Sequence, residues 1–176
     1  DVLLAANENT DGETSEDEAG STAEQLDSEA DIMSAANEAE NDPVSENAAY
    51  SITIGDVAEQ LDSWADVVSK ANAADSDVTI QLLEDTSITA ATNFTNKSVQ
   101  ITFDLNGKNI TTSKSITVNG ANVKIADTGN IEGSIESNNS SGPVIEVVSG
   151  SLEIDGGKFV SNTYYFVIQI DSGNVN

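Results

Sequence analysis

Hydrophobic and polar residues alternate in the second half of the chain, and short stretches of this alternation recur. Four stretches from residue 78 onward share the order apolar, any residue, apolar, and an acid, a glycine or an Asn-Gly pair follows within a few residues. A period of two is typical of β-strands, and the residues that follow favour turns. The stretches are VTIQLLED, ITFDLNGK, VKIADTGN and LEIDGGKF.

Three series of apolar residues advance in parallel through these stretches. Successive members lie 21 to 23 residues apart, except for one step of 28 or 29 residues that falls in the same part of the chain in every series. One insertion of six or seven residues accounts for all the long steps. The series are Val78, Ile101, Val123, Leu152 and Val175; Ile88, Ile110, Ile131 and Phe159; and Phe94, Ile116, Ile145 and Ile168.

The three series predict an all-β fold, a three-sided parallel β-helix. A chain that turns three times in each repeat, and presents an inward apolar side chain each time, buries that face only when the next turn stacks on it. We expect the right-handed form because right-handed crossovers dominate parallel β connections, although the pattern itself does not encode the hand. The alternative is a β-sandwich, whose hairpins also give short alternating strands, but a sandwich does not require three series to keep step.

A different period precedes these strands. Apolar residues between residues 55 and 75 recur at steps of three and four, with acids on the opposite side, which predicts one amphipathic helix after a short strand at residues 51–54. Asp56 is placed to cap the start of this helix. We expect the helix to cover the open first turn of the β-helix, with Trp64 in the core. The apolar stripe consists of Val57, Leu61, Trp64, Val68 and Ala71.

The first 49 residues differ in composition from the rest. They hold 15 acidic residues and neither a lysine nor an aromatic residue. Such a segment cannot bury enough apolar surface to offset the entropy lost on ordering. We therefore predict a disordered acidic arm over residues 1–49 and a folded domain over 50–176. Because the sequence stops within a repeat, we also expect the natural protein to continue beyond Asn176.

One segment of the arm has nearly the spacing of an EF-hand calcium loop. Residues 7–18 read NENTDGETSEDE, with glycine at the sixth position and oxygen ligands at Asn7, Asn9, Asp11 and Glu18. The first ligand is asparagine instead of aspartate, and neither flank predicts an amphipathic helix. An acidic tail that meets the spacing by chance is the favoured interpretation, so we expect no metal and no other cofactor, with calcium as the alternative.

Composition and charge exclude several classes of function. The chain has 31 acidic residues, six lysines, no arginine, no histidine and no cysteine, for a net charge of −25. Nucleic acids and anionic lipids repel such a polyanion, and catalytic triads and sites with histidine or cysteine ligands are excluded. No apolar run approaches the roughly 20 residues of a transmembrane helix. An acidic composition rich in Asn, Ser, Thr and Gly is common in exported bacterial proteins, so we expect an extracellular or cell-surface location.

The order of four motifs resembles a known family. SWADVVSKANAADSDVTIQLLED, FDLNGKNI, IADTG and IDGGKF follow one another as in pectate-lyase-like right-handed β-helix modules of secreted or wall-attached proteins from anaerobic Gram-positive bacteria. The resemblance covers about residues 52–176 and implies an adhesin-like or stalk module within a longer chain. Lyases of the wider superfamily use a basic residue and calcium-binding carboxylates, but this sequence has no arginine, so no lyase site can be assigned to it.

Two aspartates provide the sharpest enzymatic hypothesis. In the predicted register the outward ladder Gln81, Asp104, Ala126, Asp155 places Asp104 and Asp155 two turns apart, at about 9.6 Å. This is the outer limit of the carboxyl separation in inverting glycosidases, but Ala126 lies between them and no third charged group converges there. Lys108 and Lys158, which follow the same turns, could act as lyase bases only if burial lowered their pKa. A neighbouring ladder predicts an exposed ion pair between Lys124 and Glu153.

Binding residues are expected on the insertion and near the last repeat. The segment EGSIESNNSSGPV is predicted to leave the wall as a loop, where Asn138, Asn139, Ser140 and Ser141 could hydrogen-bond a polysaccharide. In TYYFVIQI the alternation puts Tyr164, Phe166, Ile168 and Ile170 on one face; if that face is core, Tyr165 points outward and could stack on a sugar. A solvated loop, and a Tyr165 covered by neighbouring chain, are the alternatives.

The favoured function is therefore a non-catalytic extracellular module, adhesin-like or a stalk, that binds a glycan or a cell-surface protein. A polysaccharide-degrading glycoside hydrolase or lyase, using Asp104 and Asp155, is the alternative.

Overall fold

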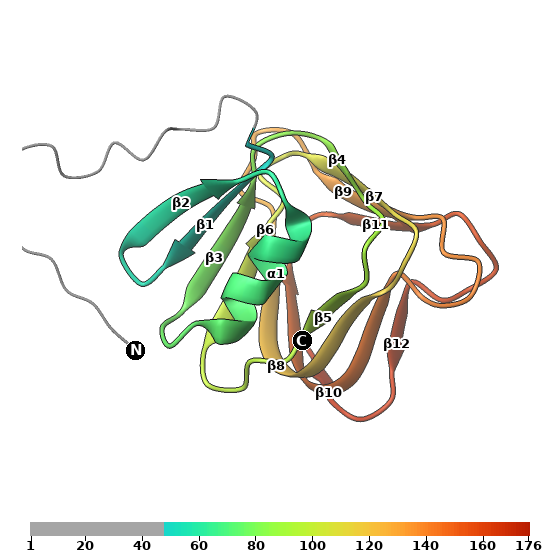
Figure 1. Ribbon diagram of the computed structural model, residues 1–176. Helices are drawn as coiled ribbons and strands as arrows, with labels where there is room; N and C mark the ends of the chain where they lie inside the picture. Colours follow the sequence, from blue (N-terminus) through green and yellow to red (C-terminus); the bar gives the residue numbers. More distant parts are fainter. Residues whose placement is uncertain (1–47) are drawn as a thin grey trace, which may run out of the picture. The chain divides into compact units, whose positions relative to one another are not determined.

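The computed structural model describes residues 48–176 of the chain, so the predicted calcium loop lies outside the described residues. The described part is mostly β-structure with one helix, and it forms a β-solenoid of about four turns (Figure 1). The helix is α1 (Trp64–Ala73). The strands are β1 (Tyr50–Ile54), β2 (Val57–Leu61), β3 (Val78–Leu82), β4 (Thr86–Ile88), β5 (Thr92–Phe94), β6 (Gln100–Asp104), β7 (Asn109–Thr112), β8 (Ile116–Ala126), β9 (Ser134–Ser137), β10 (Ile145–Asp155), β11 (Lys158–Ser161), β12 (Ile168–Ile170) and β13 (Asn174–Val175).

The strands form two sheets. The larger has the order β12-β10-β8-β6-β3-β1-β2, with β5 paired to β8 and β13 paired to β10; the smaller has the order β11-β9-β7-β4. All pairs are parallel except those of β1 with β2 and with β3. Parallel neighbours that are far apart in sequence follow from a chain that winds, because each strand pairs with its counterpart one turn later.

The first predicted series is confirmed throughout. Every member is the direct register partner of the next, from β3 through β6, β8 and β10 to β13. The third series is confirmed from Ile116 through Ile145 to Ile168. Its first member is displaced by one pleat, because Phe94 pairs with Val118 and Thr92 pairs with Ile116. A two-residue displacement keeps the side chain on the same face of the strand, so Phe94 is still buried.

The second predicted series is wrong at Ile131 and displaced at Ile88. Ile110 pairs with Ile135 and Ile135 with Phe159, whereas Ile88 pairs with Thr112. Ile131 lies in the turn after β8 and is 77% exposed, while Ile135 is fully buried. The insertion is therefore not one loop that leaves the wall, because β9 lies inside it. The additional residues divide between the turn before β9 and the loop after it.

The predicted amphipathic helix begins seven residues too early. Residues 57–61 form β2, which pairs with β1 through a tight turn at Gly55, where φ is +57°. The helix starts at Trp64, and the Ser63 hydroxyl, not Asp56, caps it by accepting a hydrogen bond from the Asp66 N–H. Val57 is consequently exposed on an edge strand, and the buried helix residues are Trp64, Val67 and Ala71.

Trp64 connects the helix to the core, as expected. Its ring lies 5.2 Å from that of Tyr50, 5.3 Å from that of Phe103 and 6.5 Å from that of Phe94. Its Nε1 donates a hydrogen bond of 2.7 Å to the Thr92 hydroxyl. The indole is thus buried with its polar atom satisfied, which is the condition for placing tryptophan in a core.

Two glycines bend the long strands. Gly120 in β8 and Gly150 in β10 have φ of +91° and +94°. A Cβ on Gly150 would lie 2.2 Å from the Ala121 carbonyl oxygen of the turn below. The two long strands pair with each other on both sides of these glycines. On its other side β8 pairs with β5 before its glycine and with β6 after it, and β10 pairs with β12 and then with β13.

The corrected second series gives a direct test of the register. Ile135→Ala is expected to lower the free energy of unfolding by about 2–5 kcal/mol because it leaves a cavity between two turns. Ile131→Ala, the same change four residues earlier on an exposed side chain, is expected to alter it by less than about 0.5 kcal/mol. Urea denaturation followed by circular dichroism measures both, and equal losses would contradict the assigned register.

Candidate functional site

Carboxylates at the ends of strands hold the backbone of neighbouring turns. The Asp77 carboxylate accepts from the Gln100 N–H at 2.9 Å, and that of Asp85 accepts from the Asn109 N–H at 2.7 Å. The Asp127 carboxylate accepts from the N–H groups of Gly107 and Gly133 at 2.7 and 2.6 Å. These bonds satisfy backbone donors at corners, where the sheet ladders are interrupted. Many acids of the described region thus have a structural use.

Asp104 is the most fully engaged of these acids. It is 4% exposed, and its carboxylate accepts four hydrogen bonds: from the N–H groups of Asn106 and Thr128, both at 2.9 Å, from the Thr128 hydroxyl at 2.6 Å and from Gln81 Nε2 at 3.1 Å. Burial raises the pKa of Asp104, but the bonds from Thr128, Asn106 and Gln81 outweigh it and hold the pKa below its usual value. An ionised carboxylate so enclosed is a structural anion and a poor proton donor.

Asp155 occupies the predicted ladder position but has different surroundings. Asp104 and Asp155 both pair with Ala126, from opposite sides, as the predicted register requires. The Asp155 carboxylate is exposed and accepts from Lys124 Nζ at 2.9 Å, and the predicted pair of Lys124 with Glu153 is present at 3.1 Å. Hydrogen bonds to Asp155 and then to Glu153 raise the pKa of Lys124. One aspartate is therefore buried in a turn and the other paired at the surface.

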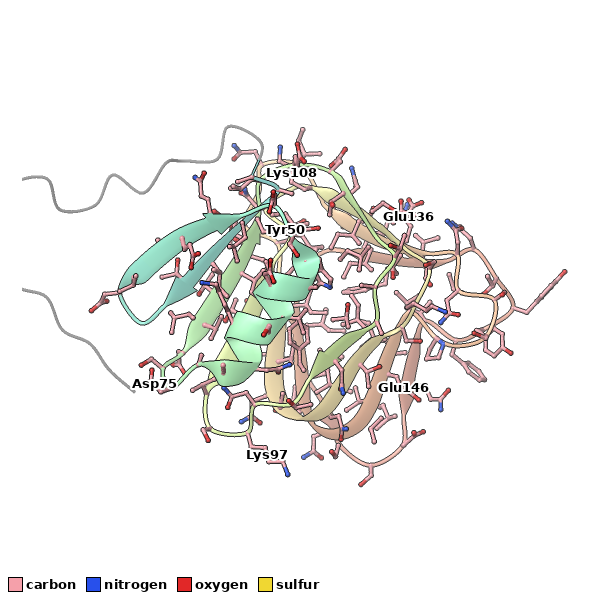
Figure 2. All side chains as sticks on the ribbon, viewed as in Figure 1. Tyr50, Asp75, Lys97, Lys108, Glu136 and Glu146 are labelled. Atoms are coloured by element: carbon pink, nitrogen blue, oxygen red, sulfur yellow. The ribbon has the colours of Figure 1, made fainter. Side chains whose placement is uncertain are left out.

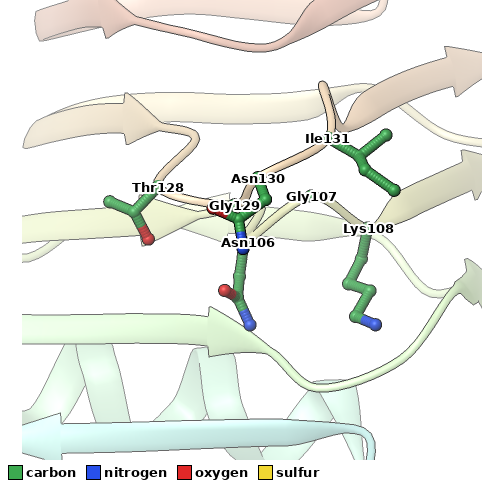
Figure 3. Close-up of a pocket in the computed structure, with 7 residues that line it drawn as sticks. All are labelled: Asn106, Gly107, Lys108, Thr128, Gly129, Asn130 and Ile131. Atoms are coloured by element: carbon green, nitrogen blue, oxygen red, sulfur yellow. The ribbon is translucent and has the colours of Figure 1, made fainter.

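Lys108 lies beside a shallow pocket formed by two stacked turns. Figure 3 shows its side chain beside that of Ile131, while the Asn106 side chain points toward the neighbouring strand, where it donates to the Leu82 carbonyl at 2.9 Å. The pocket has a volume of about 300 Å³. Gly129 lies directly on Gly107, where a Cβ would come within 2.2 Å of the Gly107 nitrogen. Lys158 lies in β11 and is exposed, and it does not line this pocket.

A second corner, where the strands of the smaller sheet end, has a repeated hydroxyl turn. Thr112, Ser137 and Ser161 stack in register, and the hydroxyl of each bonds to the residue two positions later. Such turns redirect the chain by a side-chain hydrogen bond to the backbone. Each therefore starts the segment that leads back to the larger sheet.

The predicted binding loop is folded against this corner. Asn139 is buried: its Nδ2 donates to the Ser115 hydroxyl at 3.0 Å, and its Oδ1 accepts from the N–H and hydroxyl of Ser141 at 3.1 and 3.0 Å. Asn138 is exposed and accepts a hydrogen bond of 3.1 Å from Asn162, one turn later. Asn139 thus shapes the loop, whereas Asn138 remains on the surface.

Tyr165 is the least exposed of three consecutive aromatic residues. It is 44% exposed, whereas Tyr164 is fully exposed and Phe166 largely so. The predicted core face therefore fails at Tyr164 and Phe166, which lie in a bent corner before β12 begins at Ile168, and at Ile170, which is 51% exposed at the end of that strand. Ile168 packs against the core, as expected.

Asn139 and Tyr165 line one open pocket of about 400 Å³, and Asn138 does not. We call it the Tyr165 pocket. The hydroxyl-turn segments contribute one side, and outward positions of β8, β10 and β12 contribute the other. Its walls combine an aromatic ring and a proline with hydroxyl, amide, ammonium and carboxylate groups. The remaining lining residues are Ala91, Lys114, Ser115, Thr117, Ser141, Gly142, Pro143, Glu146 and Gln169.

Among the lining residues that sequence reasoning missed, three had left a signal in the sequence. Thr117, Glu146 and Gln169 each follow a member of the third series and are direct register partners. The sequence analysis lists outward-facing residues beside the first series alone. The residues that directly follow members of the third series would have identified Thr117, Glu146 and Gln169 in the same way.

No group of three or more carboxylate, histidine or cysteine side chains within residues 48–176 is placed to hold a metal ion. The helix in this part of the chain is too short and too polar to span a bilayer.

Comparisons of the chain with protein-family models, with curated proteins and with solved structures found no match. The resemblance to pectate-lyase-like modules is not tested by them and stays a prediction.

The role of Asp104 predicts a specific loss of stability. In Asp104→Asn an NH₂ group would face the donors of Gln81 or Thr128, so the free energy of unfolding at pH 7 is expected to fall by about 1.5–3 kcal/mol. Because folding lowers the pKa of Asp104, the stabilising contribution of its carboxylate in the wild type is present at neutral pH. It is lost as the pH falls below about 4. Urea denaturation at pH 7 and pH 3 measures both effects.

Asp155→Asn is the matched control, since it removes the same charge from an exposed ion pair and should cost less than about 1 kcal/mol. Equal effects of the two substitutions at pH 7 would contradict the structural role of Asp104.

Proposed function

We propose that the chain is a non-catalytic, adhesin-like module of an extracellular or cell-surface protein, and that it binds carbohydrate at the Tyr165 pocket. A module that binds a cell-surface protein is the alternative. It would have the same extracellular location, but it would not need an aromatic ring beside hydrogen-bonding groups in a pocket. The observation that carries the proposal is the position of Tyr165, a partly exposed aromatic ring, at the edge of a pocket lined by hydrogen-bonding groups.

This combination suits a sugar. A sugar ring has an apolar face, which stacks on an aromatic side chain, and hydroxyl groups around its rim, which need polar partners. Tyrosine offers an apolar face with a polar end, and polar side chains on a rigid wall orient the ligand. Thr117, Glu146 and Gln169 project from paired strands, so their spacing is held by the sheet.

The scaffold we propose is a three-sided, right-handed parallel β-helix with an N-terminal cap. The three columns of register partners support three sides, and the general preference for right-handed crossovers supports the hand. The cap would be α1 together with the hairpin of β1 and β2. Contacts of Asn72 with the backbone of Asn93 and Thr95 support it, because they tie the end of the helix to the first turn.

The composition supports the proposed location. A net charge of −25 favours solubility without disulfides, and an acidic composition rich in Asn, Ser, Thr and Gly is common in exported bacterial proteins. The enzymatic alternative receives no support from the surroundings of Asp104, whose carboxylate is occupied by backbone and side-chain donors.

Tyr165→Ala tests the site. Loss of the ring is expected to weaken binding of any glycan that the wild type recognises by about tenfold, since truncation of an aromatic side chain that anchors a ligand costs more than about 1 kcal/mol. Tyr164→Ala, which removes an exposed ring one position earlier, should leave the affinity within about twofold. A glycan array identifies the ligand and isothermal titration calorimetry measures the affinity.

No binding by the wild type, or equal effects of the two substitutions, would contradict the proposal. Release of reducing sugar from a polysaccharide panel, abolished by Asp104→Asn in a variant shown to be folded, would favour the enzymatic alternative instead.

A further inference from the structure

Glu146 occupies a central position in the wall of the Tyr165 pocket. Its register partners are Thr117 in β8 and Gln169 in β12, and all three line the pocket. Paired residues of adjacent strands lie about 4.8 Å apart, so a hydroxyl group and an amide flank the carboxylate at a fixed distance. Glu146 is half-buried, which brings its charge close to anything bound in the pocket.

The Glu146 carboxylate has neither a hydrogen-bond partner nor an ion-pair partner among residues 48–176. Asp104, Asp127, Glu59 and Glu153 each accept at least one hydrogen bond from a neighbouring residue. Glu146 accepts none from residues 48–176 and forms no ion pair with any of their lysines. Both of its oxygens can therefore accept hydrogen bonds from a ligand.

The neighbouring groups also favour a ligand that donates hydrogen bonds. Gln169 donates one of the two hydrogens of its Nε2 to Asp171 at 2.9 Å, and its Oε1 is available as an acceptor. Three acceptor oxygens thus line the wall from two residues. Sugar hydroxyl groups can donate to them, and a bond to a carboxylate is about twice as strong as one between neutral groups.

A ligand carboxylate would meet repulsion in the same place. The ligand carboxylate would lie close to the Glu146 carboxylate, and bringing two negative charges together away from water is unfavourable. Lys114, the ammonium group of the pocket, is exposed, so solvent screening weakens its attraction to a ligand carboxylate. The surrounding molecule adds to the repulsion, since residues 48–176 hold sixteen acidic residues against six lysines.

We infer that Glu146 is a specificity-determining residue that selects neutral, hydroxyl-bearing glycans and excludes polyuronates. This inference rests on the proposed carbohydrate-binding function and adds the charge class of the ligand to it.

The test compares each neutral glycan with its own acidic form. Galactan, mannan and β-glucan are presented to the full chain beside the same polymers oxidised at C6, which replaces a hydroxymethyl group by a carboxylate. Wild-type protein is expected to bind a neutral form at least tenfold more tightly than its oxidised form. Glu146→Gln keeps the size of the side chain and removes its charge, so this ratio should fall to about threefold or less.

Glu136→Gln is the matched control, because it removes one negative charge from β9, at a separate part of the surface (Figure 2). It should leave the ratio unchanged. Preference for the oxidised forms, equal binding of both forms, or an unchanged ratio in Glu146→Gln would overturn the inference while leaving carbohydrate binding intact. If no polymer binds, or if Tyr165→Ala has no effect on binding, the proposed function fails and the inference fails with it.

Discussion

The stacking of one turn on the next is the constraint on which the rest of the structure depends. A turn of a solenoid buries its apolar residues only against a neighbour in the same register, and a slip of one residue would move every side chain to the opposite face. The unbroken pairing of Val78, Ile101, Val123, Leu152 and Val175 is therefore a requirement of burial. The same register fixes what lies outside, because an outward residue is held over its counterpart in the turn below.

Corners are where this constraint is hardest to satisfy, since the backbone leaves the sheet ladder there. At one set of corners carboxylates bind the backbone groups that leave the ladder: Asp104 and Asp127 each accept a hydrogen bond from an N–H group of a neighbouring turn. Where β7, β9 and β11 end, the hydroxyl groups of short turns form the hydrogen bonds instead. Hydrogen bonds to ionised acceptors are stronger than neutral ones, which explains why acids recur at corners in a molecule already rich in negative charge.

The sequence predicted the columns better than it predicted the corners. A column is a regular spacing of apolar residues, and two of the three were found with their members nearly correct. The sequence favours Ile131 over Ile135 because Ile131 lies 21 residues after Ile110, which continues the repeat. In the structure the turn that Asp127 holds contains four additional residues, and Ile110 pairs with Ile135. The predicted helix starts too early because Val57 and Leu61 have a spacing that fits a helix, although they lie in the edge strand β2. Hydrogen bonds at corners depend on geometry that a spacing does not encode.

The candidate site combines both kinds of information, which explains why it was predicted only in part. Asn139 and Tyr165 were recognised by residue type on segments outside the regular pattern, but Glu146 and its neighbours lie within the pattern and look like ordinary outward residues. Their significance arises only when the corner segments are folded beside them. The Tyr165 pocket forms where an irregular corner faces a regular ladder: the ladder fixes the distances between polar groups, and the corner supplies the aromatic ring.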